Sequence, residues 1–395
     1  MKLIHLTKET YEQYASTHES KPHFSQSTFF YELTETKDSF FYLGLLDQDN
    51  KLIAATILIK KLHPLNYSYF FAPNGFILDY SDETLLKKMT KTMVKFVKKR
   101  QGTFLLMNPL IKETSVGLIQ HFRSASFKQV DMMKNLDRST KEFVEIDLTG
   151  DFSKIKDKFS LDAKEHIKEA KSLNVSVSIG TEEDIDTFYH LMKNNDLNYT
   201  KDDYLKFYQS LKKQNMVTLF LANINYSTIL DKLNASSKEI RNQLSILPID
   251  NLSKSAKTKY NDLKDQQKNI LEKIKKYKQY KDEYGEVVTL SAHIVIHYND
   301  QSWLLYKAHH ETLTEPFLKD FLYEEQLKYL NKFKINKYDE EYEDKYLIDN
   351  FNAQHIKYTE DFIYITNHLN YFTKNKLIPF YRKKMTKKKN DRGES

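Results

Sequence analysis

The apolar positions between residues 226 and 284 follow the heptad spacing of two paired helices. On the way out, steps of four, seven, four and three separate Ile229, Leu233, Ile240, Leu244 and Leu247. On the way back, steps of four and three connect Ala256, Tyr260, Leu263, Gln267, Ile270, Ile274 and Tyr277. Residues 248–251 (Pro-Ile-Asp-Asn) cannot continue a helix and suit a reversal. The pattern predicts an inserted antiparallel coiled-coil hairpin that projects roughly 30 Å from the body.

The segments on either side of this hairpin alternate between strand-like and helix-like patterns. In the first half we expect strands at 40–46, 51–61 and 67–72, a helix at 82–100 and a strand at 103–107. In the second half we expect strands at 175–179, 216–222, 287–297 and 303–307, a helix at 315–331 and a strand at 334–338. Each half therefore repeats the order strand, strand, helix, strand. This order predicts an α/β (α+β) chain with two tandem acetyltransferase-like subdomains.

The domain boundaries follow from this repeat. We expect a first acetyltransferase-like subdomain at residues 1–150, completed by about 363–385, and a second one at 151–362. The second subdomain carries the hairpin of 226–284, and a basic disordered tail follows at 386–395.

Composition narrows the possible functions. The chain has no cysteine, which excludes disulfides, thiolate zinc sites and cysteine nucleophiles. It contains no run of eighteen apolar residues and no apolar leader, so we expect a cytoplasmic protein. The net charge is +7, and basic residues gather at 87–100, 154–171, 268–281 and 382–389. Such tracts suit tRNA, nucleotide diphosphates or peripheral contact with anionic lipid, and they also suit plain solvated faces. No histidine spacing predicts a metal site.

Four local motifs and the hairpin occur in one order along nearly the whole chain. The motifs are Phe-Ser-Gln-Ser at 24–27, the strand and loop at 69–79, the basic helix at 164–171, and a helix at 188–195 that leads into Tyr199 and Tyr204. Together with the hairpin they resemble the FemABX family of non-ribosomal peptidyltransferases, which build the interpeptide bridges of peptidoglycan.

The resemblance implies an aminoacyltransferase. Such an enzyme would take an amino acid from aminoacyl-tRNA, as co-substrate and without a cofactor, and join it to an amine on the stem or bridge peptide of a lipid-linked or nucleotide-linked precursor. The chain has no Arg/Gln-x-x-Gly-x-Gly/Ala loop for acyl-CoA, which favours tRNA as the donor. The hairpin would meet the tRNA, and the candidate contacts are Lys268, Lys273, Lys275 and Lys276.

Acyl transfer from an activated ester requires a proton acceptor near the amine and a hydrogen-bond donor or cation near the carbonyl. The resemblance places Asp79 at a substrate-contacting position, and Asp79 is the catalytic candidate. The alternative for Asp79 is a turn or cap beside Ser81 and Asp82. The candidate substrate-binding residues are Tyr69, Phe71, Tyr199, Tyr204, Lys164 and Lys168.

The chain also departs from the family pattern. The position of the family lysine falls on Ile348, and no glycine occurs between Gly285 and Gly393. The acidic segment 339–344 would repel a tRNA end or a diphosphate if it lined the cleft. One hypothesis is therefore a divergent aminoacyltransferase. Another is a catalytically degenerate relative that binds or regulates an active paralogue, as a homo- or heterodimer. A third is a nucleic-acid-binding protein that works through its hairpin.

Overall fold

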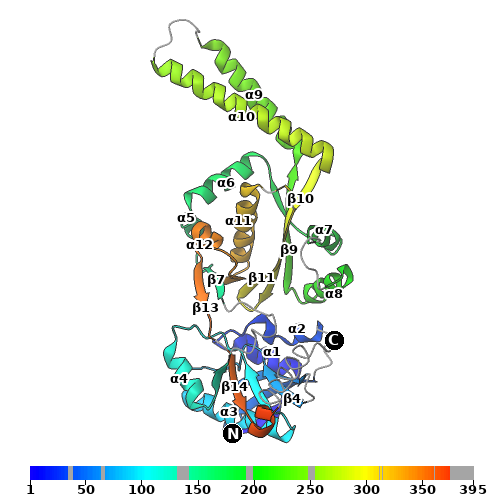
Figure 1. Cartoon of the computed structure of the whole chain (residues 1–395), viewed down its shortest axis with the longest axis vertical. Coiled ribbons are helices and arrows are strands. Elements are labelled where there is room, and N and C mark those ends of the chain that lie inside the picture. The colour runs from blue at the N-terminus through cyan, green and yellow to red at the C-terminus, as the bar shows by residue number, and fades with distance from the viewer. Residues whose placement is uncertain are drawn as a thin grey trace, which may run out of the picture.

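The computed structural model describes residues 1–33, 39–63, 67–130, 142–192, 199–247, 254–310, 312–313, 315–359 and 361–373. These residues form two lobes that follow one another along the long axis of the molecule, and a helical hairpin extends from the second lobe (Figure 1). None of the helices in this described part of the chain is long and apolar enough to cross a membrane.

The first lobe contains a seven-stranded sheet in the order β1-β2-β3-β4-β5-β14-β6. Its strands are β1 (Lys2–His5), β2 (Ser39–Leu46), β3 (Leu52–His63), β4 (Tyr67–Ala72), β5 (Phe104–Met107), β6 (Lys128–Val130) and β14 (Asp361–Ile365). Its helical segments are α1 (Lys8–Thr17), η1 (Phe24–Gln26), α2 (Thr28–Leu33), α3 (Glu83–Lys99), α4 (Val116–Ser124) and α13 (His368–Phe372). Helix α3 packs on the sheet because its apolar residues Leu86, Met89, Met93 and Val97 share one face.

The second lobe contains a sheet in the order β13-β7-β12-β11-β10-β9-β8. Its strands are β7 (Glu142–Asp147), β8 (Ser176–Ile179), β9 (Val217–Asn225), β10 (Val287–Tyr298), β11 (Gln301–His309), β12 (Lys337–Glu341) and β13 (Gln354–Lys357). One face packs against α5 (Phe152–Asp157), α6 (Leu161–Ser172), α11 (Pro316–Lys332) and α12 (Tyr346–Phe351). The other face packs against α7 (Ile185–Leu191) and α8 (Lys201–Lys212).

Counted from β1 in the first sheet and from β8 in the second, the two strand orders correspond, with β14 and β7 in sixth place, and in each sheet only the fourth and fifth strands pair in parallel. The predicted pair of tandem acetyltransferase-like halves is therefore confirmed. The halves exchange one strand, because β7 pairs with β12 and β13 of the second sheet, while β14 pairs with β5 and β6 of the first. The second sheet therefore begins before the boundary predicted at residue 150, because residues 142–147 already pair with β12 and β13. Residues 374–385 and the predicted tail at 386–395 lie outside the described residues.

The hairpin consists of α9 (Tyr226–Ile246) and α10 (Lys254–Tyr284), inserted between β9 and β10. Along the predicted apolar seam, the heptad positions of both helices are buried or half-buried, while most positions between them are exposed. At its base Tyr277 is 2% exposed and stacks on Tyr226 with ring centroids 5.9 Å apart. The hairpin rises away from the second lobe and does not lie flat on it (Figure 1). The predicted reversal at 248–251 lies outside the described residues.

We expect the exchanged strand β14 to be required for the stability of the first lobe. Phe362 of β14 is fully buried and packs on Phe122 with ring centroids 4.3 Å apart. Phe362→Ala should lower the free energy of unfolding by about 3–5 kcal/mol, measured by urea denaturation. Phe372→Ala is the matched control, since Phe372 is 54% exposed and its loss should cost less than about 0.5 kcal/mol. Equal losses for the two variants would contradict the exchange of strands.

Candidate active site

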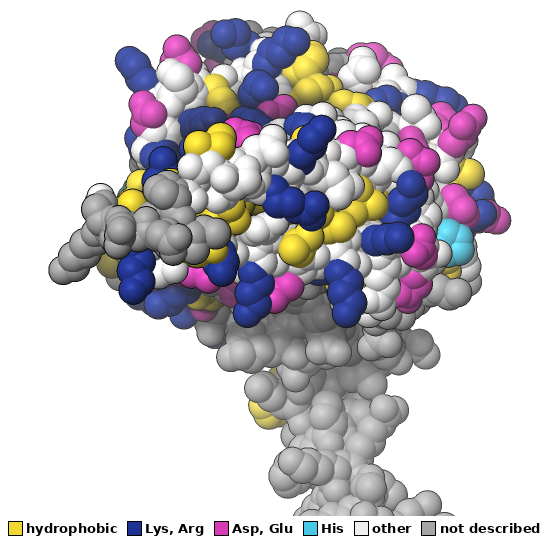
Figure 2. Space-filling view, turned by 90° about the horizontal axis from the view of Figure 1, so that it is seen from above, with side chains coloured by type: hydrophobic (Ala, Val, Ile, Leu, Met, Phe, Trp, Pro, Cys, Tyr) yellow, Lys and Arg dark blue, Asp and Glu magenta, His cyan; other side chains and the backbone are white. Residues whose placement is uncertain are grey.

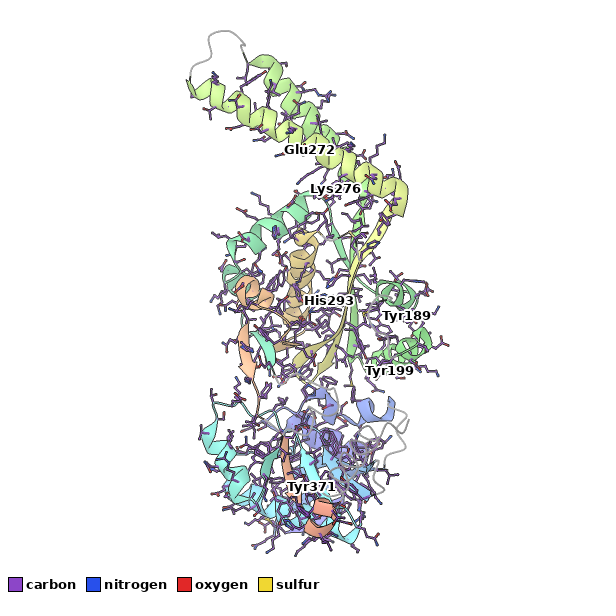
Figure 3. The ribbon with its side chains drawn as sticks, viewed as in Figure 1. Tyr189, Tyr199, Glu272, Lys276, His293 and Tyr371 are labelled. Atoms are coloured by element: carbon purple, nitrogen blue, oxygen red, sulfur yellow. The ribbon has the colours of Figure 1, made fainter. Side chains whose placement is uncertain are left out.

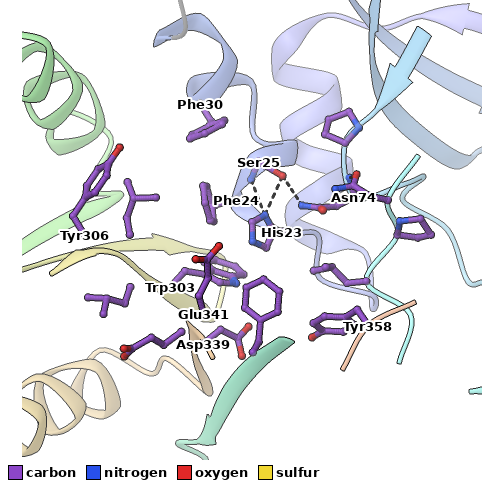
Figure 4. Close-up of a pocket in the computed structure, with 18 of the residues that line it drawn as sticks. His23, Phe24, Ser25, Phe30, Asn74, Trp303, Tyr306, Asp339, Glu341 and Tyr358 are labelled. Carbon is purple, nitrogen blue, oxygen red and sulfur yellow. Dashed lines mark hydrogen bonds between the residues drawn. The ribbon is translucent and has the colours of Figure 1, made fainter. Parts of the chain in front are cut away.

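A cavity of about 630 Å³ lies between the two lobes (Figure 4). We call it the interlobe cavity. The first lobe contributes the ends of β4 and β5 and the segment around η1, through His23, Phe24, Ser25, Phe71, Pro73, Asn74, Asn108 and Pro109. The second lobe contributes β11, β12 and the residues that follow β12, through Trp303, Leu304, Leu305, Tyr306, Lys307, Asp339, Glu340, Glu341 and Glu343.

The second lobe can form one side of this cavity because β11 and β12 stay together only briefly. They pair from Gln301 with Lys337 to Trp303 with Asp339, and pairing then stops although both strands continue. At this point β11 has a bulge, since Leu304 and Tyr306 both find partners on β10 while Leu305 is left without one. A bulge adds local twist and turns a strand away from its neighbour. The result is an opening in the sheet edged by residues 304–309 and 340–341.

Four carboxylate side chains of the second lobe line the interlobe cavity. They belong to Asp339, Glu340, Glu341 and Glu343. Asp339 is 4% exposed; its Oδ2 lies 2.9 Å from Lys337 Nζ, while its Oδ1 has no hydrogen-bond partner among the described residues. Burial raises the pKa of Asp339 to about 6, and the charge of Lys337 opposes the rise only in part. Such a carboxylate can accept a proton near neutral pH.

The carboxylate of the neighbouring Glu340, in contrast, has hydrogen-bond partners on both oxygens. It accepts hydrogen bonds from the Tyr323 and Tyr338 hydroxyls, 3.0 Å each, and from Lys307 Nζ at 2.9 Å. Lys307 also lies 2.7 Å from Glu343 Oε2. The cation and its two carboxylates hold one another in place at the edge of the opening.

The opposite wall of the interlobe cavity is aromatic and uncharged. The ring centroid of His23 lies 4.7 Å from that of Trp303 and 4.2 Å from that of Phe24. Burial lowers the pKa of His23 to about 3, so its ring is neutral at ordinary pH. His23 Nδ1 lies 3.0 Å from Ser25 Oγ, to which the side-chain amide of Asn74 donates at 2.5 Å (Figure 4). A wall of rings and amides suits an uncharged peptide chain.

A second cavity of about 560 Å³ lies on the other face of the second sheet, between α6, α11 and α12. We call it the helix-side cavity. Its polar lining includes His166, Ser291, His309, Lys319, Asp320 and Tyr346. A smaller cavity of about 210 Å³ at the hairpin base shares His166 and Glu315 with it and adds Lys273 and Lys276. Together they extend from the hairpin base toward β11.

The interlobe and helix-side cavities approach each other at the opening between β11 and β12. Lys319 Nζ lies 3.3 Å above the ring centroid of Tyr346, inside the helix-side cavity. Burial lowers the pKa of Lys319. The charge of Lys307 lowers this pKa as well, whereas the charges of Asp344 and Glu340 raise it. Lys307 lines the interlobe cavity and His309, two residues further along β11, lines the helix-side cavity.

Some predicted residues of the first lobe lie at the cavity and others do not. Phe71 lines the interlobe cavity. Tyr69 stacks on Phe104 at 4.8 Å between centroids and lines none of the cavities described above. Asp79 is exposed and lies outside them too. Its carboxylate accepts hydrogen bonds from the Ser81 hydroxyl and amide, at 2.7 and 2.8 Å, which lower the pKa of Asp79. These hydrogen bonds are the ones expected of Asp79 in its alternative role, as a turn aspartate.

The predicted residues of the second lobe lie around the site without lining it. Tyr204 is buried against Tyr306, a lining residue, with ring centroids 5.1 Å apart. Tyr199 is 49% exposed and lies edge-on to Tyr204 (Figure 3). Lys164 donates to the Asp157 carbonyl at 2.8 Å, and Lys168 is exposed on α6.

The four predicted tRNA-contacting lysines fall into two pairs. Lys273 Nζ lies 2.7 Å from Glu169 Oε1, and Lys276 forms an ion pair with Glu315, so these two bind the hairpin base to the lobe (Figure 3). Lys268 and Lys275 lie on the outward face of α10 around the exposed Leu271. Lysine and arginine side chains are spread over the hairpin end of the molecule, with acidic side chains among them (Figure 2).

Two further features bear on chemistry. Ile348, where the resemblance predicts the position of the family lysine, is half-buried and packs on the core of the second lobe. In the described part of the chain, no group of His, Asp and Glu side chains could hold a metal ion. Sequence reasoning missed Asp339, Trp303 and His23. The acidic segment was noticed, but only as a source of repulsion.

The fold and the cavities define the class: an acyltransferase-type enzyme with two acetyltransferase-like halves. The model of the FemAB family matches residues 6–339, and the chain belongs to this family. It is 23% identical over 319 residues to "Aminoacyltransferase FemA" of Staphylococcus epidermidis, covering 74% of this chain and 76% of that one. FemA of Staphylococcus aureus is 23% identical over 327 residues, with 74% and 75% covered. The crystal structure of FemX superposes with a TM-score of 0.74 at 16% identity, covering 94% and 99%. The predicted family and the predicted class, an aminoacyltransferase enzyme, are confirmed.

The single tryptophan offers a direct probe of the buried carboxylate. Trp303 pairs with Asp339 across the two strands, and both line the interlobe cavity. Because the pKa of Asp339 is about 6, the emission of Trp303 should change with a midpoint near pH 6. Asp339→Asn should abolish this transition without unfolding the protein. A midpoint near 4, or an unchanged transition in the variant, would show that Asp339 is not the perturbed group.

Proposed function

We propose that this protein transfers an amino acid from aminoacyl-tRNA to an amine on the stem or bridge peptide of a peptidoglycan precursor. The observation that carries the proposal is the pair of cavities on opposite faces of the second sheet, which approach where β11 separates from β12. Two substrates entering from opposite faces would meet at that opening. The aminoacyltransferase relatives support the same reaction class.

The interlobe cavity suits the acceptor. Its four carboxylate side chains attract an ammonium group and repel phosphate, so the peptide amine would lie there and the diphosphate of the precursor outside. The free Oδ1 of Asp339 would take the proton that the ammonium must lose before it can attack. The precursor can be lipid-linked or nucleotide-linked, because both present the same peptide.

The helix-side cavity suits the acyl donor. It opens toward the hairpin base, where Lys273 and Lys276 lie, and Lys319 inside it can face the ester carbonyl. Glu315, at the N-cap of α11, occupies the helix end where a diphosphate would otherwise bind. This carboxylate disfavours acyl-CoA and leaves tRNA as the donor, with the hairpin supporting it.

The second candidate function is a catalytically degenerate relative that binds an active paralogue. The observation in its favour is Ile348, whose half-buried apolar side chain packs against the core and cannot act as a cation. Transfer from an activated ester depends largely on positioning, so the loss of one cation does not remove the reaction. A cytoplasmic location, dimerisation, and membrane contact through the basic tract at 382–389 stay predictions from the sequence.

We expect Asp339→Asn to lower kcat/KM for transfer by about 10²–10⁴-fold, because the amide cannot accept the proton of the acceptor. The assay combines a panel of charged tRNAs with a muropeptide precursor and measures the mass gain of one residue. In the wild type, kcat/KM should rise with pH through about 6, as Asp339 becomes ionised.

Asp79→Asn is the competing variant in this assay. Loss of transfer in Asp79→Asn with retention in Asp339→Asn would assign the base to Asp79 and contradict the present choice. No transfer by the wild type with any charged tRNA, while the precursor still binds, would support the degenerate partner.

The outward lysines of α10 should contribute to tRNA binding by charge. The double variant Lys268→Ala/Lys275→Ala should weaken binding and lower the slope of log K against log salt by about 1–2. Lys98→Ala/Lys99→Ala, on exposed positions of α3 in the first lobe, removes the same charge far from the hairpin and is the control. Equal effects of the two pairs would exclude a specific role of the hairpin.

A further inference from the structure

We propose that His166 is the general acid that returns a proton to the hydroxyl group leaving the acyl ester. This inference rests on the proposed function and assigns a residue that is not among the candidates predicted from the sequence.

His166 of α6 is oriented by two further side chains, Asp320 of α11 and Tyr346 of α12. Its Nδ1 lies 2.7 Å from Oδ2 of Asp320, and the other oxygen of Asp320 accepts a hydrogen bond from the Tyr346 hydroxyl. Asp320 is 1% exposed. Because a carboxylate only accepts hydrogen bonds, Nδ1 of His166 carries the hydrogen, and Nε2 is the nitrogen available to a substrate. Asp320 and Tyr346 thus fix the orientation of the ring from α11 and α12, as in other carboxylate–histidine pairs that move protons.

His166 lies where a donor would pass. It lines both the helix-side cavity and the smaller cavity at the hairpin base, so it stands between the hairpin and the opening in the sheet. Its side chain is 37% exposed, whereas the Asp320 side chain behind it is 2% exposed. Lys319 lies beside the same group of three side chains, over the ring of Tyr346. An ester in this cavity can therefore have its carbonyl near the lysine and its leaving oxygen near the histidine.

A second histidine–aspartate pair, on the protein surface, allows a comparison with the pair of His166 and Asp320. On α7, His190 Nε2 lies 3.4 Å from Asp186 Oδ2, both side chains are more than half exposed, and neither lines one of these cavities. The His166 pair differs in its buried carboxylate, its supporting tyrosine and its position in a cavity. A plain surface ion pair requires none of these.

In the proposed reaction, one residue that transfers protons lies on each face of the sheet: Asp339 in the interlobe cavity and His166 in the helix-side cavity. The acceptor ammonium gives one proton to Asp339, and its neutral nitrogen attacks the ester carbonyl. The C–N bond forms, and Nε2 of His166 takes the second proton of the nitrogen. The C–O bond to the ribose then breaks as His166 donates this proton to the leaving oxygen. Asp339 releases its proton to solvent, so that one amide, one free hydroxyl and one net proton result.

The test compares two donors that differ in their leaving group. A ribose ester, charged tRNA, releases an alkoxide that must be protonated, whereas a thioester of the same amino acid releases a thiolate that does not, since thiol pKa values lie near 8.5. His166→Gln keeps a hydrogen-bond donor toward Asp320. It should lower kcat with charged tRNA by about 10²–10⁴-fold and kcat with the thioester by less than about threefold. Added imidazole should restore transfer from charged tRNA in His166→Gly.

His190→Gln is the matched control and should behave as the wild type with both donors. Asp339→Asn should lose transfer with both, because the amine must be deprotonated in either case. Equal losses for His166→Gln on the two donors, or no loss on either, would overturn the role of His166 while leaving the proposed function in place. A wild-type protein that transfers from neither donor would overturn the proposed function, and this inference with it.

Discussion

Strands β11 and β12 pair in parallel for three residue pairs and then separate at the bulge of Leu305, and the site depends on this separation. A continuous ladder would close the sheet with backbone hydrogen bonds and isolate its two faces. Beyond the point of separation, β11 contributes Lys307 to the interlobe cavity and His309 to the helix-side cavity. In the proposed reaction, two substrates would then react without sharing one pocket, and the strands would set their positions.

In the proposed reaction, the opposite charges of the interlobe cavity and of the hairpin surface would direct the two substrates to different faces of the sheet. The interlobe cavity presents four carboxylates and one lysine that is already paired, whereas the hairpin presents lysines on its outward face. Phosphate is repelled from the first surface and attracted to the second, and an ammonium group behaves in the opposite way. In the proposed reaction, the acidic residues of segment 339–344, at the end of β12 and just after it, would determine which substrate enters from which side. Their repulsion of a tRNA end would then be favourable, because the tRNA would approach from the other face.

The parts of this structure that could be predicted are those with a local signal. The hairpin seam was readable because heptad spacing repeats within each helix, and the burial of Ile229 and Tyr277 follows it. The exchange of β7 and β14 was not readable, since short strands carry no mark of a partner hundreds of residues away. Asp339 was missed for a similar reason: tertiary contacts that the sequence does not show bury it and raise its pKa. Asp79 had a motif, but its own neighbour Ser81 occupies its carboxylate.

The central claim is that acceptor and donor meet through the sheet of the second lobe. The most direct measurement is a crystal structure with a stable bisubstrate analogue, in which a precursor peptide amine is linked to an aminoacylated adenosine. The account predicts the peptide in the interlobe cavity, the adenosine among α6, α11 and α12, and the linkage between β11 and β12 beside Lys307. Both halves of the analogue on one face of that sheet would contradict it.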